Sequence, residues 1–198
     1  MVMKNATNRE LLVEAAASRF HRFGLPASSI ANVANDAGIP PGNVYYYFRT
    51  KDALAIAVQD HWQQRTADAL RDMDSSHEDA ASRLFDFLDR SERTAPLYAE
   101  SGCPIAALAR DFRNGDPSLQ LLAGRIFEKQ AEWIEGQFAT IGVAKRERSN
   151  AAWAILTAVQ GGIGLAHATR SEAPFRAAIA DARQRVTAMI SSRTRDQS

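Results

Sequence analysis

The stretch GIPPGNVYYYFRTKDAL, residues 38–54, places three tyrosines side by side and follows them with aromatic and basic residues. A tyrosine ring favours partial burial, and its hydroxyl needs a hydrogen-bond partner. Successive residues of a helix point about 100° apart, so three adjacent rings cannot all face one core. At least one ring must therefore lie on the outside of the fold, where it can meet a partner.

Two helices are predicted before this stretch, each with residues that favour its start and its end. Thr7 and Glu10 form a capping box, which predicts a helix that ends at Gly24. Ser28 is then predicted to cap a second helix, SSIANVANDA, that ends at Gly38. The apolar residues of both helices recur at helical spacing, so each helix has an inner face.

The tyrosines themselves lie on a third predicted helix. Pro41 suits its first turn, and the helix reaches about Phe48. Thr50 is predicted to cap a fourth helix that continues toward Leu70. Two short helices joined by a tight turn, with the second one exposed, describe a helix-turn-helix, whose second helix enters the major groove of DNA.

A groove-facing helix explains the tyrosines. One ring can pack inward beside Phe48, while the others offer hydroxyls to phosphate oxygens and ring edges to thymine methyl groups. Lys51, at the start of the next helix, can add an ion pair with a phosphate. We therefore expect double-stranded DNA as the partner of this segment.

The remaining sequence predicts helices only, because it lacks an apolar-polar alternation long enough for a strand. Ser75 and Glu78 form a second capping box, and Asp116 with Pro117 marks a further helix start. The predicted helices span 76–93, 104–112, 117–140, 145–169 and 174–192. The expected fold is all-α, with a three-helix helix-turn-helix domain at 1–52 followed by a larger helical bundle at 53–198.

The composition is that of a globular protein of a reducing compartment. Hydrophobic residues make up 45% and charged residues 24% of the 198 positions, which are ordinary globular values, and a net charge of +1 indicates no particular partner. One cysteine, Cys103, excludes an intrachain disulfide and fits a reducing cytoplasm. The N-terminus lacks the apolar core of a signal peptide, so a cytoplasmic location is expected.

One segment, residues 149–169, is long enough that a transmembrane helix must be considered. Residues 149–169 run 21 positions without a formal charge, about the length that spans a bilayer. Asn150, Gln160, His167 and three glycines make that position costly in lipid. We interpret the segment as a helix buried in a protein interface, with a transmembrane helix as the alternative, and expect no membrane partner.

The ordered motifs of LLVEAAASRFHRFGLPASSIANVANDAGIPPGNVYYYFRTKDAL resemble the TetR family of bacterial transcriptional regulators, over roughly residues 8–60. The shared features are Phe-x-x-x-Gly after the first helix, Ala-Gly after the second, then Gly-x-x-Tyr-x-Tyr-Phe and Lys-acid-x-Leu. The chain departs from the family pattern at Pro40, where a small capping hydroxyl is common, so the third helix should lack a side-chain cap. The resemblance implies a homodimeric repressor, released from a palindromic operator by a small-molecule or reactive effector that binds residues 53–198.

The resemblance also assigns roles along the recognition helix. Gly42, Asn43, Tyr45 and Tyr46 would face the bases or the groove, and Asn43 suits adenine because a carboxamide can pair with it bidentately. The remaining implied DNA contacts are Tyr47 and Lys51 to phosphates, Ser28 and Ser29 to the DNA backbone, and Pro41 at the helix start.

Three of these assignments have alternatives. Tyr45 could serve mainly in packing, Asn43 could be a solvated surface amide, and Lys51 could be an ordinary exposed lysine. A cation at a helix start is electrostatically unfavourable, however, and is better explained by a nearby anion. Val44 and Phe48 are expected in the core because of their helical spacing.

Family members are typically homodimers, and two predicted helices carry suitable stripes of small and apolar residues. The GGIG segment follows no strand and precedes no Gly-Lys-Ser, so we interpret it as a place of close helix approach rather than a phosphate loop. Two helices from each subunit would form a four-helix bundle. The predicted interface residues are Trp153, Leu156, Gln160, Gly161, Gly164, Phe175, Ile179, Ala182 and Val186.

An effector cavity is implied by the family, and aromatic residues of the larger domain are candidates for its walls, although such residues more often belong to the core. Cys103 precedes Pro104 at a predicted helix start, where a thiolate is favoured; it is either a sensor of oxidants and electrophiles or an inert small hydrophobe. The candidate pocket residues are Trp62, Phe85, Tyr98, Cys103, Phe112, Phe127 and Trp133.

Other function classes have little support in the sequence. The four histidines form no His-x-x-x-His pair, and neither a nucleophile-base motif nor a metal-ligand spacing appears. We therefore expect no catalytic residue, no metal and no cofactor. An enzyme and a purely structural protein-binding module remain the two rival interpretations, and salt-dependent DNA binding would separate them from a regulator.

Overall fold

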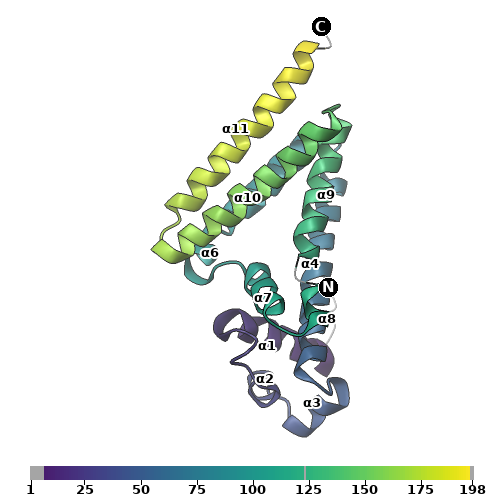
Figure 1. Ribbon diagram of the computed structural model, residues 1–198, viewed down its shortest axis with the longest axis vertical. Coiled ribbons are helices and arrows are strands. Elements are labelled where there is room, and N and C mark those ends of the chain that lie inside the picture. The colour runs from purple at the N-terminus through teal and green to yellow at the C-terminus, as the bar shows by residue number, and fades with distance from the viewer. Residues whose placement is uncertain (1–6, 123, 197–198) are drawn as a thin grey trace. The chain divides into compact units, whose positions relative to one another are not determined.

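The computed structural model of this chain describes residues 7–122 and 124–196, with side chains described as far as Ser192. In that part of the chain every regular element is a helix, as the sequence predicted (Figure 1). The helices are α1 (Asn8–Phe23), α2 (Ile30–Asp36), α3 (Pro41–Tyr47), α4 (Lys51–Ser76), α5 (Ala80–Arg93), α6 (Ala95–Ser101), α7 (Pro104–Arg113), α8 (Pro117–Gln120), α9 (Arg125–Thr140), α10 (Lys145–Thr169) and α11 (Ala173–Asp196).

Packing divides the chain into two compact units. The first unit comprises the chain up to Arg65 together with Pro104–Gly124, and the second unit comprises Thr66–Cys103 together with the chain from Arg125 onward. Helices α7 and α8 thus pack with the N-terminal helices, although the chain reaches them only after α6. This division describes packing, and the proposed extent of the DNA-binding domain, 1–52, stays a prediction.

Helix α1 begins and ends as predicted. The Thr7 hydroxyl accepts from Glu10 N at 3.3 Å, and the Glu10 carboxylate accepts from Thr7 N at 2.7 Å. Gly24 follows the last turn with a φ of 81°, a conformation that residues with a side chain rarely adopt, and its N–H donates to Phe20 O. Local capping chemistry therefore fixes both ends of this helix.

The start of α2 differs from the prediction by one residue. Ser29, rather than Ser28, is the N-cap: its hydroxyl accepts from Asn32 N at 3.1 Å, and the Asn32 side chain accepts from Ser29 N at 3.2 Å. The Ser28 side chain is instead buried and donates to Gly24 O at 2.8 Å. The turn after Gly24 closes through this bond, which leaves the next serine to cap the helix.

Helix α3 is anchored by two side chains. Val44 and Phe48 lie in the core of the first unit, as their spacing predicted. Pro40 occupies the N-cap position without a side-chain hydrogen bond, also as predicted. The Arg9 guanidinium lies over the Phe48 ring, 5.3 Å from its centroid, which adds a cation–π contact to this anchor.

Helix α4 runs further than the sequence indicated. Thr50 caps it by accepting from Ala53 N at 3.1 Å, but the helix continues to Ser76. The predicted capping box at Ser75 is therefore wrong, because the Ser75 hydroxyl bonds back to Asp72 O within the helix. Asp79 caps α5 instead, accepting from Ser82 N at 2.8 Å.

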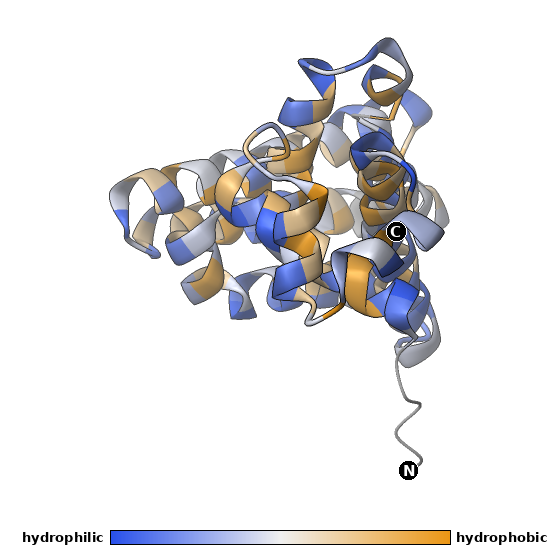
Figure 2. Cartoon of the chain, turned by 90° about the horizontal axis from the view of Figure 1, so that it is seen from below, coloured by the Kyte–Doolittle hydropathy of each residue, from blue (hydrophilic) through white to orange (hydrophobic). Residues whose placement is uncertain are grey.

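The second unit is built around α10, which packs against α11, α9 and α6. Hydrophobic and hydrophilic residues alternate along the helices, so each presents an apolar side to its neighbours (Figure 2). Helix α10 has the predicted bounds, 145–169. The predicted helix 117–140 is broken into α8 and α9, and α6, with a proline in its first turn, was not predicted at all.

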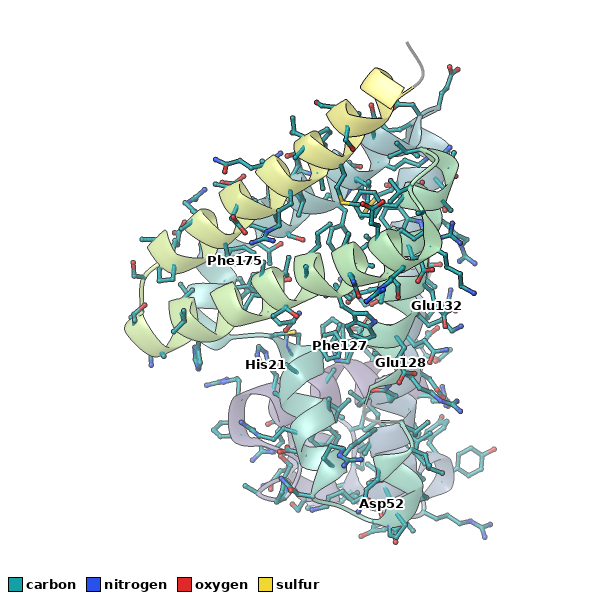
Figure 3. The ribbon with its side chains drawn as sticks, turned by 45° about the horizontal axis from the view of Figure 1, so that its top comes forward. His21, Asp52, Phe127, Glu128, Glu132 and Phe175 are labelled. Carbon is teal, nitrogen blue, oxygen red and sulfur yellow. The ribbon has the colours of Figure 1, made fainter. Side chains whose placement is uncertain are left out.

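Gly162 allows α10 and α11 to approach closely. A Cβ added there would lie 2.8 Å from Ala178 Cβ and 3.1 Å from Phe175 Cδ2, closer than van der Waals contact permits. Phe175 lies on α11 at this crossing (Figure 3). The predicted close helix approach at the GGIG segment is thus present, and within the subunit it belongs to Gly162.

We expect Gly162→Ala to lower the free energy of unfolding by up to about 2 kcal/mol, because the overpacking cost of ~1–3 kcal/mol offsets or exceeds the ~1 kcal/mol gained in helix propensity. Gly136→Ala is the matched control: it lies inside α9 and an added Cβ meets nothing within 4 Å. That variant should be more stable by about 0.5–1 kcal/mol. Denaturant titrations of both variants check the opposite signs, and a stabilising Gly162→Ala would contradict the packing.

Helix α10 is also long and apolar enough, by length and composition, to cross a membrane. Core helices of bundles meet the same criterion, and α10 buries Ile155, Val159 and Ile163 against its neighbours. Only 39% of its most apolar window is buried, however. The exposed remainder includes Trp153 and Leu165, large apolar side chains that a protein interface or a lipid environment would cover.

Candidate nucleic-acid interface

The three tyrosines of α3 have different environments. Tyr45 is 57% exposed and Tyr46 is 84% exposed, so both rings face away from the core. Tyr47 is partly buried, packs against the first unit's core and meets the Tyr46 ring edge-on at 5.0 Å. The structure therefore leaves the Tyr45 and Tyr46 side chains on the surface, and the Tyr47 ring packs against that of Tyr46.

The first turn of α3 continues this exposed face. Pro41, Gly42 and Asn43 are all exposed, and a Cβ added at Gly42 meets nothing within 4 Å. The Asn43 carboxamide is exposed on the same helix as Tyr46. Backbone and side chains here are open to a bulky partner, which direct contact with base edges requires.

Two predicted contact residues have supporting positions instead. Ser28 is 3% exposed, and its hydroxyl is occupied by Gly24 O. Lys51 donates to Leu25 O at 3.1 Å and to Pro26 O at 3.3 Å, so carbonyl oxygens compensate this cation at a helix start, and its contact with a phosphate stays a prediction. Ser29, which is exposed at the N-cap of α2, remains available to a ligand.

Two family models match this chain. Residues 12–58 match "Bacterial regulatory proteins, tetR family", and residues 87–181 match "Transcriptional regulator LmrA/YxaF-like, C-terminal domain". This chain belongs to the TetR family. It is accordingly a helix-turn-helix transcriptional regulator and not an enzyme, as the sequence predicted.

Related proteins agree with this assignment. The chain is 25% identical over 173 residues to an uncharacterized HTH-type transcriptional regulator in the lacX 3' region of Lactococcus lactis, covering 82% of this chain and 84% of the relative. It is 21% identical over 175 residues to the HTH-type transcriptional regulator LmrA of Bacillus subtilis, covering 87% and 93%. Both similarities extend across nearly the whole TetR-family chain.

Solved structures show the same fold. A TetR transcriptional regulator from Legionella pneumophila superposes with a TM-score of 0.81 at 25% identity, covering 92% of this chain and 98% of that one. A TetR transcriptional regulator from Chloroflexus aurantiacus gives a TM-score of 0.78 at 22% identity, covering 91% and 94%. The helical architecture of this TetR-family chain is thus shared over about nine-tenths of its length.

The residues predicted for a TetR-type dimer interface divide into two groups. Trp153, Gly161 and Gly164 are exposed on α10, Gln160 is partly exposed, and a Cβ at either glycine would meet nothing within 4 Å. The others are buried within the subunit, where α11 packs on α10 and α5, so the prediction of a single interface stripe is wrong for them. The buried residues are Leu156, Phe175, Ile179, Ala182 and Val186.

The candidate effector residues also fall into the two units. Phe112, fully buried, and Trp62, partly buried, pack in the first unit. In the second unit, four of the remaining five are partly buried against the core, and Phe127 lies on α9, also partly buried (Figure 3). Those four are Phe85, Tyr98, Cys103 and Trp133.

The surroundings of Tyr98 shift its pKa. Burial, reinforced by the nearby Cys103, raises the pKa of Tyr98 to about 12. Its ring meets Phe175 edge-on at 5.3 Å. The hydroxyl is therefore neutral across the physiological pH range, and Tyr98 can serve an effector only as a neutral donor or acceptor.

A polar cluster of the second unit was missed by sequence reasoning. The Trp133 indole N–H lies 3.1 Å from both carboxylate oxygens of Asp74, and the buried Gln137 donates to the same carboxylate at 3.3 Å. Nearby, Arg90 hydrogen bonds hold the pKa of Asp86 below its usual range. The i, i+4 spacing of Trp133 and Gln137 shows in the sequence that both side chains lie on one side of a helix. Their partner, Asp74, lies on α4, and no local pattern identifies it.

Within the part of the chain that the structure describes, no group of three or more His, Cys, Asp or Glu side chains is placed to hold a metal ion.

Proposed function

We propose that this TetR-family regulator is a cytoplasmic, homodimeric repressor that binds a palindromic operator and leaves it when a small-molecule effector binds. The observation that supports this most directly is the exposed pair Tyr45 and Tyr46, held outward by buried Val44 and Phe48. A helix that buries its apolar side and exposes its tyrosines suits the major groove. The proposed DNA contacts are Ser29, Pro41, Gly42, Asn43, Tyr45, Tyr46 and Tyr47.

The exposed side of α10 is the proposed dimer interface. Trp153 is 47% exposed and Leu165 is 59% exposed, and the open glycines 161 and 164 lie on the same helix. Large exposed apolar side chains are typical of an interaction surface. A two-fold axis through this surface would pair two recognition helices, which must then be about 34–36 Å apart to read successive major grooves.

The effector is proposed to act through the second unit. Its partly buried aromatics, Phe85, Tyr98 and Trp133, offer apolar surface, and Asp74 with Gln137 offers polar groups beside it. An effector releases DNA only if it binds better to the dimer geometry that cannot span two grooves. A compound that raises expression of the repressed genes in cells should therefore weaken operator binding by the purified protein.

Salt dependence tests the DNA-binding proposal. If the dimer makes six or more phosphate contacts, its affinity for DNA upstream of its own gene should fall roughly 1,000-fold between 50 and 200 mM salt. Gel shifts over that range, with a scrambled duplex as control, measure the slope. A flat response would favour the rival protein-binding module.

Repression has its own test. Deleting the gene should raise transcription from the promoter that carries the protected operator, and reduced transcription would show an activator instead.

A further inference from the structure

The backbone of the turn between α1 and α2, residues 24–29, forms hydrogen bonds with side chains of other helices. Helix α1 ends when Gly24 N donates to Phe20 O at 2.9 Å. The next amide, Leu25 N, lies beyond the helix, and Leu25 is almost fully buried. A buried backbone N–H needs an acceptor, so the partner of Leu25 N decides where this turn can lie.

Asp111, on α7, supplies that acceptor. Its Oδ2 accepts from Leu25 N at 2.7 Å, across 86 positions of sequence, and the Asp111 side chain is 9% exposed. The absent Cβ of Gly24 matters here, because it would lie 3.4 Å from the same oxygen. On the outer side, Arg110 Nη2 lies 3.4 Å from Oδ1. The buried carboxylate is thus aimed at the turn.

Lys51 holds the same turn through its carbonyl groups. Its ammonium donates to Leu25 O at 3.1 Å and to Pro26 O at 3.3 Å, and Ser28 N also donates to Leu25 O. The N–H of Leu25 is therefore satisfied by α7 and its C=O by α4. Both contacts lie inside the first unit.

We infer that Asp111 is a positioning residue for DNA binding: its hydrogen bond to the α1–α2 turn places Ser29 and the start of α2 against the operator. This inference rests on the proposed function. Helix α7 follows Cys103, the residue at which the chain leaves the second unit. A displacement of α7 would therefore act on the α1–α2 turn through this hydrogen bond.

Asp111→Ala and Asp111→Asn test the role, because Asn keeps an oxygen acceptor and Ala does not. In the full-length protein, Asp111→Ala should weaken operator binding at least tenfold, the loss expected from about one charge-assisted hydrogen bond. Hydrogen exchange at the Leu25 amide should accelerate in parallel. Asp111→Asn should bind within about threefold of the unchanged protein, and Arg110→Ala, which removes only the outer contact, within about twofold.

Operator affinity within twofold of the unchanged protein, despite lost protection of the Leu25 amide, would overturn the inference. If Asp111→Ala does not fold, Asp111→Glu serves in its place: it keeps the charge but moves the acceptor by one methylene, and it should bind more weakly than Asp111→Asn. Equal binding by Glu and Asn variants would also overturn it. Failure of the unchanged protein to bind any operator would overturn the proposed function itself.

Discussion

Replacing Tyr45 and Tyr46 together by alanine is expected to weaken operator binding by roughly 1,000-fold or more, since the two subunits together lose four groove contacts at ~1–3 kcal/mol each. Both rings are exposed, and neither belongs to the core of the first unit. The melting temperature should therefore change by no more than a few degrees. Loss of DNA binding without loss of fold identifies contact residues.

Fluorescence anisotropy with a labelled operator measures this effect, and circular dichroism measures the melting temperature. Leu121→Ala is a suitable control, because Leu121 is also a large exposed side chain of the first unit but lies outside α3. The double Tyr→Phe variant separates hydroxyl contacts from ring contacts. Operator binding that survives the double alanine variant would place the recognition surface elsewhere.

Gly164→Arg is expected to convert the proposed dimer into a monomer. Inside the subunit a Cβ added at Gly164 meets nothing within 4 Å, and Gly164 is exposed, so the fold should tolerate a longer side chain there. At a two-fold interface it places a bulky cation near its own copy, and like charges brought together cost several kcal/mol. We expect the dimer dissociation constant to rise at least 100-fold, with a matching loss of operator affinity.

Analytical ultracentrifugation at micromolar concentration measures the association. Gly136→Arg is the matched control, since it places the same side chain at an equally open helical glycine on α9. That variant should remain dimeric and bind DNA. A dimeric Gly164→Arg protein with unchanged operator affinity would show that the subunits meet through another surface.

Sequence reasoning predicted those parts of the fold that depend on neighbouring residues. The Thr7 capping box, the stop at Gly24 and the Asp116 cap all act within four residues, and all are present. The shift from Ser28 to Ser29 shows the limit of this approach. Either of two adjacent serines can cap a helix by its local pattern. The fold of the turn decides that Ser28 is buried and that Ser29 is the cap.

The candidate sites were harder to predict because they depend on which side of a helix is covered. Phe175, Ile179 and Val186 have a spacing that suits a partner subunit as well as α10, and only the folded chain shows that α10 and α5 use it. The contacts of Lys51 with Leu25 O and of Asp111 with Leu25 N join residues 26 and 86 positions apart. No local pattern encodes such pairs.

The brevity of α3 has a consequence for the living cell. A seven-residue helix, with no side-chain cap at its start, is far shorter than the roughly 12–15 residues that an isolated helix needs in water. Helix α3 therefore forms only while Val44 and Phe48 are packed in the core of the first unit. A rise in temperature that loosens this core would abolish operator recognition in one step and, in the proposed repressor, derepress the regulated genes, while every groove-facing side chain stayed chemically intact.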